Sequence, residues 1–384
     1  VAFMAAAIAV GSGQQVALMA PTDILARQHL RRARRMFDGI DVNIGLLTGS
    51  LGAAQKRSTL AGLRGDAPAE SHNVSLLHDP GNRIDLVIGT HALFQDECTF
   101  EALGLVIVDE QHKFGVEQRE GLLEKGRDPH LLAMTATPIP RSLAHAAFGD
   151  LDLTLIREKP PGRKPVRTYL RDRNAASDVY EYVRERIVET GEQAYFVYPM
   201  VEASEAAASR RNVTDSAEAL ANGPLSELRV AILHGQMGDR AKDDAMRRFA
   251  AGEVDVLCAT TVVEVGVDVE NATLMVIESP EMFGLSQLHQ LRGRVGRGST
   301  ESMCILLAGF GLTDDAAERL NSFAATDDGF ELAEVDLEIR GPGEFLGVRQ
   351  SGLPEFRFGD LLRDDDLLDA ARRDARRLML GDAS

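Results

Sequence analysis

The chain has 384 residues, of which 44% are hydrophobic, and a formal net charge of −17 at pH 7. This length allows two domains with sizeable cores, and the composition is that of a folded protein, which excludes a disordered one. The negative charge argues against a protein that coats nucleic acid nonspecifically, although a local basic groove can still bind phosphates.

The cysteines give no sign of a metal site. The three cysteines, Cys98, Cys258 and Cys304, are scattered without a CxxC pair, which indicates a reducing, cytoplasmic location and no zinc. No run approaches the ~20 apolar residues of a membrane span, so we expect no membrane association. The chain begins with Val, and we expect it to be a fragment.

The first elements alternate between helix and strand patterns. Val1–Val10 is Ala-rich and apolar, which predicts a buried helix, and Gly11-Ser12-Gly13 predicts the turn that ends it. A strand is expected over Val16–Ala20. The phosphate-binding pattern GxxxxGK[ST] is expected before such a helix, but a Gly-Lys pair occurs nowhere in these residues.

The next helix is expected to begin at Thr22, because Pro, Thr and Asp are typical of helix starts. Its apolar residues share one face and its arginines share the other: Ala26, Leu30, Ala33 and Phe37 against Arg27, Arg31, Arg34 and Arg35. A charged face is usually only solvated. The functional alternative is that Thr22 and the helix N-terminus bind a nucleic-acid phosphate.

Two strands then end in polar residues. Residues 50–82 are expected to be helix and loop, followed by a strand over Ile84–Ile88 that ends in Gly89-Thr90-His91. The apolar run Leu105–Val108 predicts a strand buried on both faces, and it stops at Asp109-Glu110-Gln111-His112. Chemistry gathers at the carboxyl ends of parallel strands.

Two adjacent acids at such an end are costly unless a cation, usually a metal, lies beside them. We therefore expect Asp109 to hold Mg²⁺ and Glu110 to orient or deprotonate a water that attacks a γ-phosphate. A strand that runs into an acidic turn is the ordinary alternative. A strand over Leu131–Met134 leads into Thr135-Ala136-Thr137, whose threonines can bond these carboxylates and face the second domain.

The second half repeats the strand–helix rhythm after a Pro- and Gly-rich linker, Pro160–Pro165, near which we place the domain boundary. A second parallel sheet is predicted. Its expected strands are Ala194–Tyr198, Val230–Leu233, Val254–Ala259, Leu274–Glu278 and Met303–Leu307.

Two motifs lie on this second sheet. Thr260–Asp268 follows a strand, and Gln287–Arg297 places three arginines among glycines, a cluster that a triphosphate would neutralise, with Arg294 or Arg297 as the arginine finger. A basic surface helix is the alternative, which Gly293 and Gly296 disfavour by ~1 kcal/mol each. From Leu312 onward the chain is charged and helical in pattern, interrupted by Gly/Pro-rich loops at 336–344 and 349–352.

Together these stretches resemble a superfamily 2 helicase motor, and specifically the RecG-type branch-migrating DNA helicases. The resemblance runs from Val1 to about Asp366. The stretches that look like motifs Ia, Ib, II, III, V and VI are, in that order, Ala20–His29, Gly89–His91, Asp109–His112, Thr135–Thr137, Ala259–Asp268 and Gln290–Arg297.

The resemblance implies an α/β fold with two RecA-like parallel-sheet domains in tandem, residues 1–155 and 167–310, joined by a linker at 156–166. Residues 311–384 would form a helical hairpin and a translocation loop. It implies an ATP-dependent DNA helicase that remodels stalled forks and Holliday junctions in recombination and repair. ATP and Mg²⁺ would be its cofactors and branched double-stranded DNA its partner, and we expect a cytoplasmic monomer.

The resemblance also assigns residue roles. ATP would lie between Asp109 and Glu110 on one side and Arg294 and Arg297 on the other. The residues implied at the nucleotide are Asp109, Glu110, Gln290, Arg294 and Arg297 for catalysis, Gly266 and Asp268 for binding, and Asp109 for the metal. Those implied in DNA contact or coupling are Thr22, Thr90, His112, Thr135, Thr137, Thr260, Thr261, Arg319, Arg340 and Gln350.

The chain also departs from the family. Lys113 stands where the family usually has Arg, and the phosphate loop and the wedge domain that splits branched DNA are absent. We therefore expect little or no ATPase activity from these 384 residues, while the intact protein would have ATPase and helicase activity. The alternatives are a non-catalytic nucleic-acid-binding module derived from such a motor, or the motor part of a transcription-repair coupling factor. The interpretation as an RNA helicase is disfavoured, because the tail from Arg340 to Gly352 resembles that of double-stranded DNA translocases.

Overall fold

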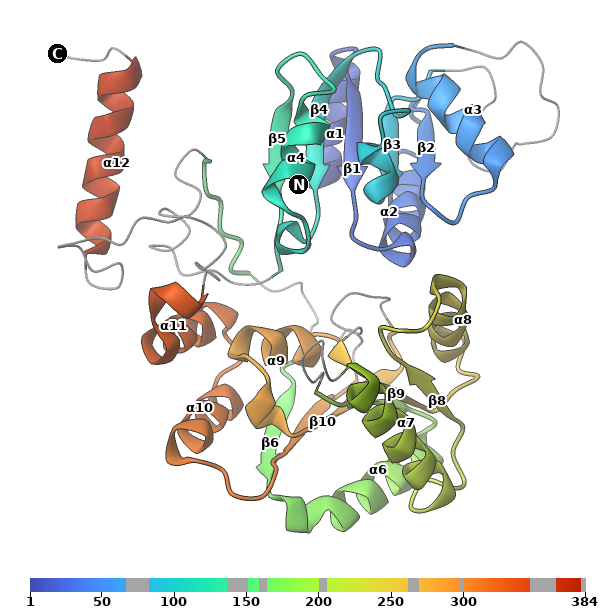
Figure 1. The fold of residues 1–384 in the computed structure, drawn as a ribbon, viewed down its shortest axis with the longest axis vertical. Coiled ribbons are helices and arrows are strands. Elements are labelled where there is room, and N and C mark those ends of the chain that lie inside the picture. Colours follow the sequence, from blue (N-terminus) through green and yellow to red (C-terminus); the bar gives the residue numbers. More distant parts are fainter. Residues whose placement is uncertain are drawn as a thin grey trace. The chain divides into compact units, whose positions relative to one another are not determined.

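The structure is a computed structural model that describes residues 1–66, 83–136, 151–158, 164–199, 206–261, 269–296, 298, 300–345 and 364–380. These residues form two compact units (Figure 1), one up to Ala136 and one from Leu151 onward. Residues 159–163 of the predicted linker lie outside the described ranges, so its bounds stay a prediction. Every helix in these ranges is too short or too polar to cross a lipid bilayer.

The first unit is built on a sheet of five parallel strands in the order β2-β3-β1-β4-β5. Its strands are β1 (Gln15–Met19), β2 (Ile44–Leu47), β3 (Leu86–Gly89), β4 (Leu103–Val108) and β5 (His130–Ala133). Its helices are α1 (Ala2–Gly11), α2 (Asp23–Met36), α3 (Ala53–Leu63) and α4 (Val116–Leu123), with short 3₁₀ turns η1 (His91–Phe94) and η2 (Gln111–Lys113). Because the strands are parallel, their carboxyl ends share one edge.

Apolar residues on both faces of this sheet explain its burial. All of β1 and the last four residues of β4 are buried, and one core lies on each face. The apolar face predicted for α2 is confirmed, since Ala26, Leu30 and Ala33 are buried. The prediction that Val1–Val10 is a buried helix is only half right: α1 is a helix, but Met4 and Ile8 are 66% and 74% exposed.

The second unit holds six parallel strands in the order β6-β11-β10-β7-β9-β8. They are β6 (Arg167–Arg171), β7 (Gln193–Val197), β8 (Val230–Leu233), β9 (Val256–Ala259), β10 (Ala272–Glu278) and β11 (Met303–Leu307). The helices are α6 (Ala176–Thr190), α7 (Ala206–Asn222), α8 (Asp239–Ala250), α9 (Leu285–Arg292), α10 (Asp314–Ala325), α11 (Gly329–Phe345) and α12 (Asp365–Leu380).

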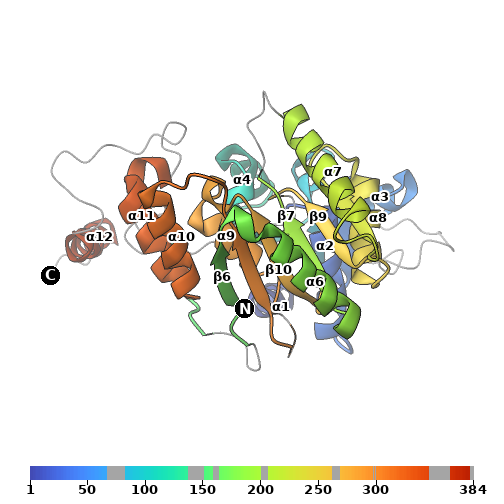
Figure 2. The same cartoon turned by 90° about the horizontal axis from the view of Figure 1, so that it is seen from below.

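Helices lie along both edges of the second sheet. Figure 2 shows α10 and α11 on the side of β6. Helices α7 and α8 pack against β8 at the other edge. The loop expected at 336–344 is wrong, because α11 continues through Gly341-Pro342-Gly343 to Phe345. A proline inside a helix removes one backbone hydrogen bond and its ring crowds the preceding turn. The helix nevertheless continues, and Leu332, Ala333 and Leu337 earlier in α11 are buried.

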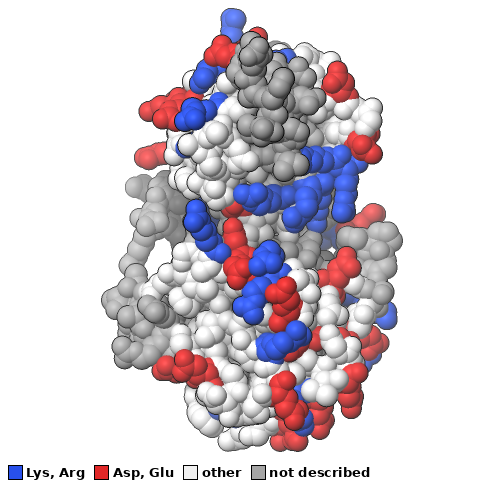
Figure 3. Space-filling model, turned by 90° about the vertical axis from the view of Figure 1, so that its right-hand side faces the viewer, with Lys and Arg blue, Asp and Glu red and all other residues white. Residues whose placement is uncertain are grey.

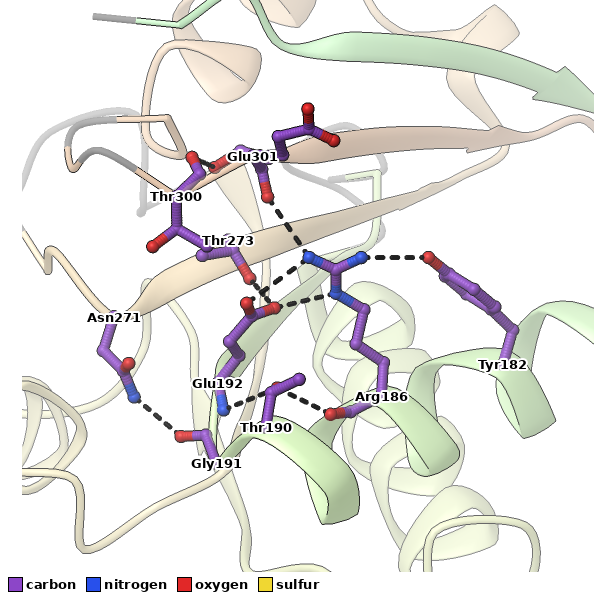
Figure 4. A network of polar contacts seen from close by, with 10 residues as sticks. Tyr182, Arg186, Thr190, Gly191, Glu192, Asn271, Thr273, Thr300 and Glu301 are labelled. Carbon is purple, nitrogen blue, oxygen red and sulfur yellow. Dashed lines mark hydrogen bonds and ion pairs between the residues drawn. The ribbon is translucent and has the colours of Figure 1, made fainter. Parts of the chain in front are cut away.

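A polar network fastens the amino end of the second sheet (Figure 4). The buried Glu192, just before β7, accepts hydrogen bonds from Arg186 Nε at 2.8 Å and from Thr273 Oγ1 at 2.6 Å. The hydrogen bond that Arg186 donates to Glu192 raises the pKa of Arg186. The network therefore ties α6, β7 and β10 together at the edge away from the carboxyl ends of the strands.

Candidate active site

The carboxyl end of β4 presents Asp109 and Glu110 on a tightly held corner. The amide of Asp109 donates to Met19 O at 2.9 Å, and the amide of Gln111 donates to Met134 O at 2.9 Å, so β1 and β5 fix it from both sides. Glu110 adopts the left-handed conformation, with φ 51° and ψ 54°. Such a backbone is strained for a non-glycine residue, and strained residues cluster at functional sites.

Hydrogen bonds orient both carboxylates. Asp109 Oδ1 accepts from the amide of Glu110 at 3.0 Å, and Oδ2 lies 2.8 Å from His29 Nε2. Glu110 Oε2 accepts from the amide of Ala136 at 3.3 Å. The structure thus brings together the acid pair and the segment after β5, where the backbone amide of Ala136 contacts Glu110. Thr135 is exposed beside it, and Thr137 lies outside the described residues.

The oxygen ligands at this corner fit a Mg²⁺ that is bound together with a nucleotide. A nucleotide-bound Mg²⁺ is usually held by one or two carboxylates, substrate phosphates and water. A carboxylate has about four lone-pair sites. The contacts with His29 and with the Glu110 amide use two of those of Asp109, so its carboxylate can still bind a cation. Within the described part of the chain, no group of three or more His, Cys, Asp or Glu residues could form a closed metal cage.

Polar loops continue along the same edge of the first sheet. Thr22 caps α2, its Oγ1 accepting from the amide of Leu25 at 3.4 Å. Thr90 follows β3, where a Cβ at Gly89 would collide with the carbonyl oxygen of Leu47. The Thr90 hydroxyl is buried without a hydrogen-bond partner among the described residues. Thr22 is therefore partly exposed, whereas the Thr90 hydroxyl is buried.

Residues that sequence reasoning missed lie after β2. Asp23 Oδ2 accepts from Ser50 Oγ at 2.6 Å and from Arg27 Nε at 3.0 Å, and Thr48 Oγ1 lies 3.3 Å from Ser50 Oγ. Burial alone would raise the pKa of Asp23, but the hydrogen bonds from Ser50, Thr48 and Arg27 outweigh it and lower the pKa. Strand β2 was not predicted from the sequence. The mostly apolar run Ile44–Leu47 followed by Thr-Gly-Ser could have indicated a strand that ends in polar residues.

In the second unit, two of the predicted nucleotide residues lie on α9 or two residues after it. A glycine, Gly284, begins the helix, and its amide is bound by Gln287 Oε1 at 3.2 Å. Gln290, in the last turn of α9, and Arg294, two residues after the helix ends, are partly exposed. Arg297, Gly266 and Asp268 lie outside the described residues. Thr260 is buried, with its hydroxyl unpartnered among the described residues, and Thr261 is partly exposed.

The prediction that three arginines gather on a triphosphate is wrong for Arg292. This side chain is buried, and its guanidinium lies 4.2 Å from the centroid of the Phe323 ring. Nη1 donates to Phe323 O, in the last turn of α10, at 3.0 Å and to Thr326 O, just after the helix, at 2.8 Å. Burial lowers the pKa of Arg292. Unpaired carbonyls at a helix C-terminus attract cations, so this arginine fastens α9 to α10.

Comparison with protein families finds helicase domains along the chain. The family models that match are DEAD/DEAH box helicase over residues 1–146, helicase conserved C-terminal domain over 178–299, and ATP-dependent DNA helicase RecG, domain 3, C-terminal, over 326–384. ATP-dependent DNA helicase RecG of Thermotoga maritima is 46% identical over 367 residues, which are 96% of this chain and 45% of the relative. The Bacillus subtilis RecG is 45% identical over 383 residues, 100% of this chain and 53% of the relative.

Over nearly its whole length the chain is similar to RecG-type helicases. A structure of RecG bound to a three-way DNA junction has 43% identity and a TM-score of 0.74, covering 96% of this chain and 45% of that one. A structure of the helicase MrfA bound to DNA is similar in fold alone. It has 16% identity and a TM-score of 0.57, and the match covers 84% of this chain and 46% of that one. The tandem RecA-like fold is therefore confirmed. The chain spans about half the length of the RecG relatives it matches.

The remaining residues implied by the RecG resemblance lie in the second unit or on short turns. Arg319 of α10 donates from Nη2 to Glu281 O at 2.7 Å, and so ties α10 to the 3₁₀ turn η6 (Pro280–Met282). Arg340 lies in α11 and His112 in η2, but their side chains are not described. Gln350 lies outside the described residues. The roles of these residues stay predictions.

Basic side chains gather in places despite the negative net charge. Figure 3 shows Lys and Arg concentrated on part of the surface. In α2 the exposed arginines are Arg31, Arg32, Arg34 and Arg35. A local positive field of this kind attracts phosphates regardless of the net charge of the whole chain.

Proposed function

We propose that this chain is the motor part of an ATP-dependent DNA helicase that remodels branched DNA, including stalled replication forks and Holliday junctions, in recombination and repair. The observation that carries the proposal is the acid pair Asp109 and Glu110 on a strained, hydrogen-bonded corner at the carboxyl end of β4. The RecG relatives are named ATP-dependent DNA helicases, and one structure is described as bound to a three-way junction.

Each part of the acid pair has a separate role in this proposal. Asp109 would hold Mg²⁺, which when bound supplies positive charge to the phosphates. Glu110 orients or deprotonates the attacking water, and the amide of Ala136 holds its carboxylate in place. Gln290, Arg294 and Arg297 would bind the γ-phosphate and stabilise the charge that develops on it. Gly266 and Asp268 would contribute to nucleotide binding.

We propose that DNA is held through its sugar-phosphate backbone, which carries no base sequence information. Of the threonines proposed at the DNA backbone, Thr22, at the N-terminus of α2, and Thr261 are partly exposed. Thr90 and Thr260 would need a change of conformation to contact a phosphate, because their hydroxyls are buried. Discrimination should therefore follow branch structure and not base sequence.

The test uses the longest natural polypeptide that contains this sequence, with the 384-residue chain measured in parallel. Glu110→Gln should bind a three-way junction as the unchanged protein does, by fluorescence anisotropy. Its junction-stimulated ATP hydrolysis should fall by 10²–10⁴-fold, the usual contribution of general acid–base catalysis. Unchanged turnover would remove Glu110 from the role of base.

The 384-residue chain itself should hydrolyse ATP slowly or not at all, because these residues contain no Gly-Lys-Ser/Thr sequence for the β- and γ-phosphates. Robust junction-stimulated turnover by this chain would overturn that prediction. If the longer polypeptide also binds junctions without any hydrolysis, the protein is a non-catalytic nucleic-acid-binding module. The similarity to RecG over nearly the whole chain argues against a transcription-repair coupling factor.

A further inference from the structure

A histidine on α2 contacts the aspartate at the end of β4. His29 Nε2 lies 2.8 Å from Asp109 Oδ2, and the two side chains are 13% and 21% exposed. His29 follows the cap residue Thr22 by seven positions, which is about two helical turns. One rigid helix thus carries a proposed DNA-contacting residue at its start and a contact to the proposed metal ligand further along.

The position of His29 is fixed by packing on both sides. Its ring meets Phe3 of α1 edge to face, with 6.3 Å between ring centroids, and Phe3 meets Phe37 in the same way at 6.3 Å. Ala26 and Leu30 of the same helix are buried in the core. A shift of α2 along the sheet would therefore move the imidazole with it, because the ring has little freedom to stay behind.

The contact also determines how Asp109 can receive a cation. With Nε2–H donating to Oδ2 and the Glu110 amide donating to Oδ1, the carboxylate is held by one donor on each oxygen. Partners of this kind orient metal-ligating groups, and their loss typically reduces metal affinity by 10–100-fold. A displacement of His29 would thus change the geometry that Asp109 offers to a nucleotide-bound metal.

We infer that His29 is a positioning residue that couples DNA binding at the N-terminus of α2 to the carboxylate of Asp109. The inference rests on the proposed function. DNA phosphates that pull on the start of α2 move His29, and His29 sets the orientation of Asp109. By thermodynamic linkage, the nucleotide must then change the affinity for DNA by the same factor as DNA changes the affinity for the nucleotide.

The test is the ratio of junction affinities with and without Mg²⁺ and a non-hydrolysable ATP analogue. It is measured by fluorescence anisotropy in the longest natural polypeptide that contains this sequence. We expect a ratio of at least about 5, the lower end of typical allosteric coupling. In His29→Phe, which keeps a ring against Phe3 and removes the donor, the ratio should fall towards 1 while each ligand still binds.

Two further variants separate coupling from packing. His29→Gln, which restores an amide donor, should recover part of the ratio, whereas a purely structural role gives Gln no advantage over Phe. His130→Phe, on an exposed residue at the start of β5, should leave the ratio unchanged. Thermal unfolding of each variant checks that it is folded.

The outcomes distinguish the two proposals. If the unchanged protein binds both ligands with a ratio above 5 and His29→Phe keeps it, the inference about His29 is wrong and the proposed function stands. If His29→Phe and His29→Gln lose the ratio equally while both are folded, the donor is not what couples the sites, and the inference is again wrong. If the unchanged protein binds no nucleotide or no junction, the proposed function fails first.

Discussion

The carboxyl ends of β4 and β10 have the same backbone corner in the two units. Glu110 and Ser279 are both left-handed, at φ 51°, ψ 54° and φ 48°, ψ 56°, and each is followed by a 3₁₀ turn. A glycine then begins a helix in each, and its amide is bound by a glutamine three residues on, at 3.1 Å in the first unit and 3.2 Å in the second.

The acids before these corners differ in what surrounds them. Asp109 stays partly exposed beside His29. Glu278 is 5% exposed, and its oxygens are taken by Arg173 and by Tyr180 Oη, the latter at 2.6 Å. Burial, followed by the charge of Glu278, raises the pKa of Tyr180. The fold thus supplies the corner twice, and neighbouring side chains decide whether its acid serves chemistry or structure.

The opposite ends of the sheets carry a second repeated device. Gln15 begins β1, and its Nε2 donates to Leu63 O at 3.0 Å and Ile84 O at 2.7 Å. Gln193 begins β7, and its Nε2 donates to Phe249 O at 2.7 Å and Val254 O at 2.6 Å. Both glutamines are buried. The units therefore match at their amino ends as structure, and the difference between them is concentrated at the carboxyl ends.

Tyr180→Phe, at the corner after β10, is expected to have the largest effect on stability. The change removes a hydrogen bond to a buried carboxylate, and bonds to charged groups contribute about 1.5–3 kcal/mol. Urea denaturation should show that loss in the free energy of unfolding, with junction affinity unchanged. If junction binding falls while stability is unchanged, Glu278 belongs to a functional site, and the distinction between a functional Asp109 and a structural Glu278 is wrong.

A smaller effect is expected from Asp23→Asn, at the same edge as Asp109. The pKa of Asp23 is lowered in the folded state from 3.8. A lowered pKa stabilises the fold above pH 3.8, and this contribution disappears as the pH falls through the folded-state pKa. Unfolding measured from pH 7 to pH 2 should show a deficit of roughly 1 kcal/mol at neutral pH that narrows below 3.8. A deficit independent of pH would show that the charge of Asp23 is not responsible.

The smallest effect is expected from Ser279→Gly. A left-handed backbone is strained for serine and free of that strain for glycine, so the variant should be more stable by up to about 1 kcal/mol. Thermal unfolding measures the shift. A destabilised Ser279→Gly would mean that the serine side chain contributes more than its backbone strain removes.

The acidic corner was predictable because its signal is local. The apolar run before Asp109 predicts a buried strand, and parallel strands gather their carboxyl ends at one edge. The edge strand β6 was not predicted from the sequence. Only three less polar residues lie between Arg167 and Arg171, and so short a run is a weak strand pattern.

The contacts of the site depend on residues far apart in the sequence, and sequence patterns do not reveal them. Helical spacing places His29 on the apolar face with Ala26 and Ala33. Its partner Asp109 lies 80 positions away, and no pattern in the sequence identifies that contact. Arg292 lies in a run that predicts phosphate binding, yet the carbonyls at the end of α10, 31 and 34 positions away, receive it. The exposure of Met4 and Ile8 was hidden because α1 is apolar on all sides.

The most direct test compares the two acids in one assay. Junction-stimulated ATP hydrolysis is measured in the longest natural polypeptide containing this sequence, for Asp109→Asn and for Glu278→Gln, with thermal unfolding as the check on folding. The account predicts that Asp109→Asn loses at least about 100-fold in hydrolysis and stays folded, whereas Glu278→Gln loses stability and keeps its turnover while folded. Full turnover in Asp109→Asn, or loss of turnover in a stably folded Glu278→Gln, would contradict it.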